Sequence, residues 1–282
     1  LWGGGRTSFG YSDPEDVLDL MQEYGISVRL TFSNSLLREE HLSDKKCNDL
    51  CKMLDCSHSA QSGTSNILRS TPKFKKSFTE SAAESFSNAH HIQNGLIVHS
   101  DLLLNYLIEN YPDLYLVSST TKVLTDFQDF LNEVKREEFR YVVPDFRLNK
   151  MFDKLDLMSQ HQKDKVEFLC NECCWFGCKD RKACYESVSR KNLGFPTPEF
   201  HCASPDGNEG YRFSKAMENP GFISVDAIQN IYMPMGFSNF KIEGRGLGSA
   251  LILEFLLYYM TKPEYQLRVR EEIYLDNMLD LF

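Results

Sequence analysis

The sequence predicts a single α/β domain, residues 1–282, built as a TIM-type (β/α) barrel. Short apolar or β-branched strands alternate with helices at roughly 25-residue intervals, which is typical of a parallel sheet with helical crossovers. The 282 residues suit such a barrel, which takes about 250. Polar side chains recur where the predicted strands end. Counting a first strand expected ahead of Leu1 gives about eight strands, and an open doubly wound sheet is the alternative.

The first half of the chain supplies three of these strands and their helices. Ser12 or Asp13 can cap a helix whose first position is Pro14, and Gly25 ends it. Alternating apolar residues then predict a strand over 26–32. Further strands are predicted over 96–99 and 114–117, with a helix over 101–107 after a cap at Ser100 or Asp101.

The second half continues the alternation. Helices are predicted over 126–134 and from a cap at Asn149 to Met158, and strands over 141–143, 166–170, 222–225 and 237–242. Two helices, 249–260 and 263–281, close the chain. Residues 57–91 are rich in serine and show no periodicity, so we expect a surface insertion there.

Composition and charge narrow the function classes. The net charge of −9 and the pI of about 5.3 argue against a bulk nucleic-acid-binding surface, although a small-molecule or RNA substrate remains open. The longest apolar run, 247–260, is too short for a membrane span and contains Glu254. Nine cysteines without a visible secretory signal indicate reduced thiols and a cytoplasmic protein. A homo- or hetero-oligomer is left open.

Residues 170–220 are predicted to be a cysteine-rich metal-binding segment that follows a late strand. Six of the nine cysteines lie in this part of the chain. Four of them have the spacing C-x3-C-x5-C-x17-C, namely Cys174, Cys178, Cys184 and Cys202. Three close thiolates and one distant thiolate suit a 4Fe-4S cluster, and zinc is the alternative. Cys173 is the substitute for Cys174, since adjacent residues rarely both face one metal. In the first half, Cys47 and Cys51 share a helix face, where buried thiols are favoured over a second metal site.

The carboxyl ends of the strands predict where a substrate binds, because parallel strands of a barrel all end at one mouth. The expected substrate-binding residues are Asn34, His99, Thr120, Asp145 and Asn171, and Glu172 is expected to act in catalysis. The run KIEGRGLGSA adds Glu243 and Arg245 ahead of a helix start. Arg245 can grip a carboxylate or phosphate and Glu243 can orient it or act as base, although a structural Glu–Arg pair is the alternative.

The run SVDAIQNIYMPMGFSNFKIEGRG resembles the collagenase-like peptidase family U32. The match falls on an Asp-containing turn, a glycine and the KIEGR sequence, namely Asp226, Gly236, Lys241, Ile242, Glu243, Gly244 and Arg245. The preceding strand and cysteine region also looks like that family, through Glu167, Phe168, Cys174, Cys178 and Cys202. The resemblance covers 165–251 in motif and the remaining chain in its βα rhythm.

The resemblance implies a barrel with a 4Fe-4S cluster held by four cysteines. It further implies oxygen-independent hydroxylation of RNA bases or quinone precursors, with prephenate linked as the oxygen source. The sequence departs from the family at Asn171 and Glu172, which replace its histidine–glycine pair. No cysteine follows Asp226, so Cys184 must serve as the fourth ligand.

The sequence is therefore compatible with three alternative functions. The first is an iron–sulfur enzyme that modifies an anionic or aromatic small molecule or an RNA base. The second is a peptidase, as the family label says, although the sequence contains no nucleophile elbow and no HExxH motif. The third is a non-catalytic barrel with a structural zinc or cluster.

Overall fold

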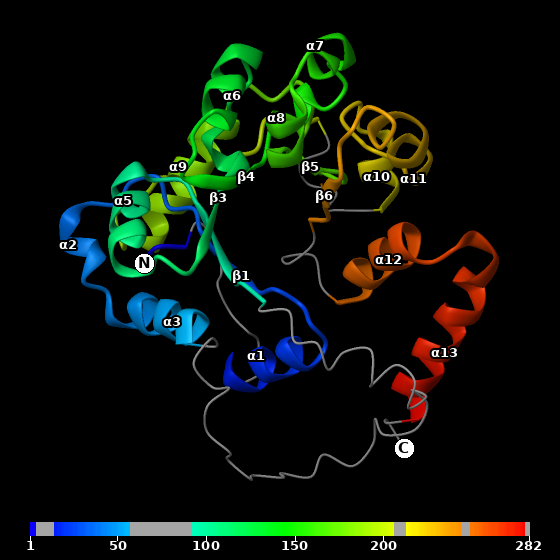
Figure 1. Ribbon diagram of the computed structural model, residues 1–282, viewed down its shortest axis with the longest axis horizontal. Coiled ribbons are helices and arrows are strands. Elements are labelled where there is room, and N and C mark those ends of the chain that lie inside the picture. The colour runs from blue at the N-terminus through cyan, green and yellow to red at the C-terminus, as the bar shows by residue number, and fades with distance from the viewer. Residues whose placement is uncertain (4–13, 57–91, 206–212, 244–248, 280–282) are drawn as a thin grey trace.

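The computed structural model describes residues 1–3, 14–56, 92–205, 213–243 and 249–279 (Figure 1). The expected insertion over 57–91 lies outside the described residues. The described part is an α/β fold of parallel strands and helices. None of its helices combines the length and the apolar character that crossing a bilayer requires.

Two parallel sheets form the centre of the fold. Four strands pair in chain order, namely β1 (Arg29–Phe32), β2 (Gly95–Val98), β3 (Tyr115–Ser118) and β4 (Phe139–Val142). The second sheet pairs β5 (Glu167–Leu169) with β6 (Asn239–Lys241). A single bridge between Val142 and Val166 connects the two sheets. Within the four-stranded sheet the strands lie in chain order, without the reversal that marks a doubly wound sheet.

Helices connect and cover these strands. Those before β5 are α1 (Pro14–Glu23), α2 (Glu39–Leu42), α3 (Lys45–Cys56), α5 (Asp101–Asn110), α6 (Phe127–Val134), α7 (Phe152–Asp156) and α8 (Gln160–Lys165). Those after β5 are α9 (Arg181–Asn192), α10 (Phe213–Glu218), α11 (Val225–Ala227), α12 (Ser249–Met260) and α13 (Gln266–Leu279). Short 3-10 turns lie at Thr120–Lys122, Phe146–Leu148 and Pro263–Tyr265, and a π-helical turn lies at Ile228–Tyr232.

Each face of the sheet packs in its own core. Leu96, Val98 and Leu116 face the helices, where they join Leu103 of α5 and Phe130 of α6 in the main core. The intervening residues form a smaller cluster on the opposite face, made of Ile97, Tyr115, Val117, Val143 and Leu169. Because both faces are buried, these strands read as continuous apolar runs.

The sheet is strongly curved. Arg29 of β1 forms an ion pair with Glu167 of β5. In a flat sheet these strands would lie about 19 Å apart, four spacings of about 4.8 Å, which is beyond the reach of the two side chains. The pair therefore shows that the inner face bends until β1 and β5 approach each other.

Three sequence-based expectations are corrected. The barrel is wrong as a closed barrel, because no pairing joins β6 to β1 among the described residues. Residues 222–225 are not a strand, since Ser224 instead caps α11 by accepting from the backbone N–H of Ala227. Asn149 does not cap a helix but is buried, and it donates to the carbonyls of Leu169 and Gly221. The six strands of the described residues are fewer than the eight or so of a closed barrel.

Candidate functional site

The carboxyl ends of β4, β5 and β6 bring four of the expected site residues together. Asp145 follows β4, Asn171 and Glu172 follow β5, and Glu243 follows β6. Asn171 binds the backbone of Glu243 in both directions, accepting at 2.7 Å and donating at 2.9 Å. This reciprocal pair replaces the sheet ladder where β5 and β6 separate, so it fixes the position of Glu243.

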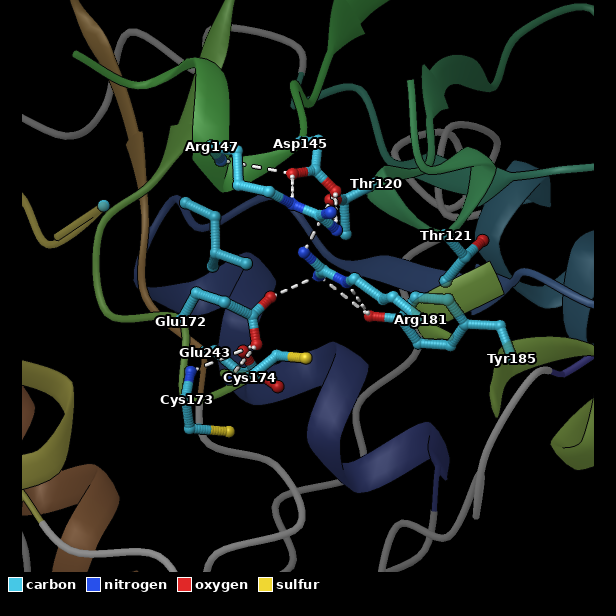
Figure 2. Close-up of polar contacts among 12 residues, drawn as sticks. Thr120, Thr121, Asp145, Arg147, Glu172, Cys173, Cys174, Arg181, Tyr185 and Glu243 are labelled. Carbon is cyan, nitrogen blue, oxygen red and sulfur yellow. Dashed lines mark hydrogen bonds and ion pairs between the residues drawn. The ribbon is translucent and has the colours of Figure 1, made fainter. Parts of the chain in front are cut away.

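Arg181, on the first turn of α9, connects these strand ends (Figure 2). Its guanidinium is buried and forms ion pairs with Glu172 and, at 3.2 Å, with Asp145. Tyr185, one turn later, accepts from the same guanidinium at 2.9 Å. Burial alone would lower the pKa of Arg181, but the charge of Glu172 and these other partners raise it. Arg181 is therefore a permanent cation within the site.

Glu172 and Glu243 form a carboxyl pair in different environments. Glu172 is buried and accepts from the backbone N–H groups of Cys173 at 3.1 Å and Cys174 at 2.9 Å, besides Arg181. Burial and the adjacent charge of Glu172 raise the pKa of Glu243 to about 8. Near neutral pH, Glu243 is therefore protonated beside a carboxyl group held by hydrogen bonds and an ion pair, and two carboxyls in such different environments are the usual arrangement for an acid and a base.

The four cysteines expected as ligands are neighbours next to this pair. Burial raises the pKa of Cys174 to about 12, and a hydrogen bond with the Cys178 thiol adds to this. Cys184 lies near both Cys178 and Cys202, and their charges add to burial in raising its pKa. All four are free thiols. The adjacent Cys173 instead lies with Glu172 and Glu243, so the structure separates the two adjacent cysteines.

These four thiols suit a soft metal by their donor chemistry. A single zinc ion with bonds of about 2.3 Å would hold sulfurs roughly 3.8 Å apart. Among the described residues, no three of the four sulfurs lie within 4.8 Å of one another. The four sulfurs thus do not have the spacing of a bound tetrahedral ion, and the group that they would hold stays a prediction.

The remaining expected residues lie elsewhere or outside the description. Asn34 is buried and binds the backbone carbonyls of Leu1 and Ser189, which joins β1 to α9. The His99 ring bonds the Thr121 hydroxyl at 2.8 Å, and Thr120 donates to the Pro144 carbonyl. Arg245 lies outside the described residues. Asn34, His99 and Thr120 thus form hydrogen bonds with neighbouring backbone and side-chain groups of the protein.

Sequence reasoning missed Arg181, Tyr185 and Arg147. Arg147 binds Asp145 at 2.7 Å and the carbonyl of Cys178 at 3.0 Å, so it connects β4 to the cysteine segment. The usable signals were the i, i+4 spacing of Arg181 and Tyr185 and the position of Arg147 two residues after a strand-end aspartate.

Comparisons with known proteins add one finding. No protein-family model matches the chain, and no curated protein matches it either. A solved structure, that of the U32 peptidase Mk0906, is similar to 76% of this chain over 75% of its own length, with 15% identity and a TM-score of 0.40. At that level the likeness assigns neither a family nor an activity.

Proposed function

We propose that this chain is an iron–sulfur enzyme whose Cys174, Cys178, Cys184 and Cys202 hold a 4Fe-4S cluster. The observation that carries the proposal is the run of neighbouring thiols beside the carboxyl pair at the strand ends. Arg147 contacts the backbone of Cys178, and Asn219 donates to the carbonyls of Glu172 and Cys174. The same bonds therefore position the cysteine segment and the carboxylates.

The substrate we propose is an anionic or aromatic small molecule or an RNA base, modified by hydroxylation-type chemistry. Arg147 offers a partly exposed cation for an anionic group. Trp175 and Phe176 are exposed aromatic side chains in the cysteine segment, where a planar substrate can stack. Glu172 would serve as base and Glu243 as proton donor. The cluster would supply electron-transfer capacity when bound.

Purification without oxygen tests the cluster directly. We expect brown protein with about four irons per chain, and we expect Cys178→Ser and Cys184→Ser to lose iron. Cys51→Ser, which replaces a buried thiol on α3, is the control and should retain it. One zinc per chain and no colour would instead make the site structural.

A peptidase is the second candidate, favoured by the paired carboxyls of Glu172 and Glu243. Two carboxyls that share a site, one protonated and one ionised, are the machinery of aspartic peptidases. Peptide cleavage by the purified protein, abolished in Glu243→Gln but unchanged in the iron-free Cys184→Ser, would favour this candidate. Cleavage that persists in Glu243→Gln would exclude the pair as its cause.

A further inference from the structure

A second group of metal-binding side chains lies beside the four cysteines. Glu172, Cys173 and Glu243 each place one donor atom within 4.8 Å of the other two, which no other described set of three such residues achieves. They come from the ends of two paired strands, β5 and β6. Glu172 is buried and Cys173 is exposed, so an ion can reach the group from solvent.

This group is distinct from the four-cysteine set. Cys174 hydrogen-bonds Cys178, whereas the thiol of its neighbour Cys173 lies by the carboxyl groups of Glu172 and Glu243. Figure 2 shows the two sulfur atoms at separate positions, that of Cys173 lower in the view than that of Cys174. The thiols of these two adjacent residues therefore belong to two different groups of candidate metal ligands.

The ligand positions are held in advance by other hydrogen bonds. Glu172 accepts from two backbone N–H groups and from Arg181. These three bonds occupy three of the roughly four lone-pair sites of its carboxylate. Glu243 is fixed through its backbone by Asn171. Bonds of this kind orient ligating carboxylates in metal sites.

An unsatisfied atom points to a missing partner. Oε2 of Glu243 is enclosed and has no hydrogen-bond partner among the described residues. A buried polar atom without a partner is rare in folded proteins and calls for a water or an ion. The Glu243 carboxyl also hydrogen-bonds the Glu172 carboxyl, so the atom left without a partner belongs to a residue of this group.

We propose that Glu172, Cys173 and Glu243 bind one divalent ion of the Zn²⁺, Fe²⁺ or Co²⁺ class. The thiolate disfavours Mg²⁺ and Ca²⁺, which prefer oxygen ligands only. Three protein ligands leave a fourth position open for water or substrate, as in catalytic zinc sites. The proposal goes beyond the proposed function and does not require that the four cysteines bind a cluster.

Cobalt(II) titration of the protein as purified tests the proposal, with iron content measured on the same sample. We expect one Co²⁺ to bind with a near-ultraviolet thiolate-to-cobalt absorption band. Cys173→Ser should lose the band and weaken binding by at least about 100-fold, since outer-shell changes alone cost 10–100-fold. Because Cys173 is exposed, this variant should fold. Glu243→Gln should also weaken binding, and the exposed-site control Glu199→Gln should not.

Two outcomes would overturn the proposal. One is wild-type protein that binds Co²⁺ without the thiolate band or not at all, and the other is Cys173→Ser that binds it unchanged. Iron content separates this test from the proposed function. Cys173→Ser should retain its iron, whereas Cys184→Ser should lose iron and still show the cobalt band.

Discussion

Arg181 shows how a single residue sets the geometry of the site. Its side chain is only 2% exposed and it neutralises two buried carboxylates, Glu172 and Asp145. Arg181→Met should destabilise the protein by about 3–5 kcal/mol, because Glu172 stays buried without a cation while Asp145 keeps only Arg147. Arg181→Lys should destabilise it less, since lysine keeps the charge but not the planar fork that meets two partners. Urea unfolding gives both values.

Arg190→Met on the same helix is the matched control. Arg190 is exposed, so its loss should change the free energy of unfolding by no more than about 0.5 kcal/mol. Equal losses for Arg181→Met and Arg190→Met would mean that the buried ion pairs contribute nothing specific.

His99 makes stability depend on pH. Burial and the positive charges of Lys122 and Lys182 lower the pKa of His99 to about 4, against about 6.5 in an unfolded chain. Between these values the unfolded state binds a proton that the folded state does not. Stability due to this residue is therefore complete above pH 6.5, falls as pH decreases to about 4, and then levels off.

The difference between wild type and His99→Gln isolates this effect from the titrating carboxylates. From pH 6.5 to 5, wild type should lose at most about 2 kcal/mol more than the variant, and less because the ring is partly exposed. Unfolding free energies at the two pH values measure it. An identical pH dependence for both proteins would contradict the lowered pKa.

At the residue scale, the sequence predicted the polar residues at the strand ends but not the arginine that connects them. Asp145, Asn171, Glu172 and Glu243 could be predicted because parallel strands end at one edge. Arg181 could not, because its partners lie on two different strands and only the folded chain brings them together. Whether these residues bind substrate stays a prediction.

Helix ends are the elements whose local chemistry can be tested most simply. Asp126 caps α6 by accepting from the backbone N–H groups of Gln128 at 2.7 Å and Asp129 at 3.1 Å. Asp126→Ala should lower the free energy of unfolding by about 1 kcal/mol, and Asp126→Asn should be nearly neutral. Asp113→Ala, at another exposed aspartate, is the control. Thermal unfolding of the three variants measures these differences. Equal stabilities for all three would mean that the Asp126 cap does not stabilise the protein.

At the element scale, segments with an apolar periodicity could be predicted, whereas helix α9, which carries Arg181, could not. The helix over 126–134 and the strands β1 to β6 follow from apolar periodicity and capping residues. Helix α9, RKACYESVSRKN, has no apolar face to reveal it. It is held by the buried Arg181 and by Ser189, which accepts from Ser35 and Asn34. The false strand over 222–225 shows the reverse case, because Phe222 and Ile223 are apolar for packing alone.

Across the whole molecule, one core and several polar contacts join the two sheets. The main core runs from Trp2 and Phe32 to Phe168 and Phe237 without a division. The Arg29–Glu167 pair connects β1 to β5 across the inner face. An open sheet is thus held curved by its own side chains, although no closing strand is present among the described residues.

This organisation predicts that both sheets unfold together. The chain has two tryptophans. One lies beside the four-stranded sheet, and the other lies in the cysteine segment that follows β5. Trp2 is buried against Phe32, and Trp175 lies in the cysteine segment after β5. In Trp175→Phe, fluorescence reports the N-terminal part, and in Trp2→Phe it reports the cysteine segment. Within each variant we expect the urea transition by fluorescence to coincide with that by far-ultraviolet circular dichroism.

Comparison within one variant removes the effect of each substitution on stability, which matters because Trp2→Phe alters a packed site. A Trp175 transition that precedes the loss of helix signal would show that the cysteine segment opens first, and that the contacts of Arg147 and Arg181 do not couple it to the sheet. Coincident transitions with and without bound metal would instead place the segment within the cooperative core. In that case a metal bound by the proposed ligands would stabilise the whole domain, because the folded state alone presents those ligands together.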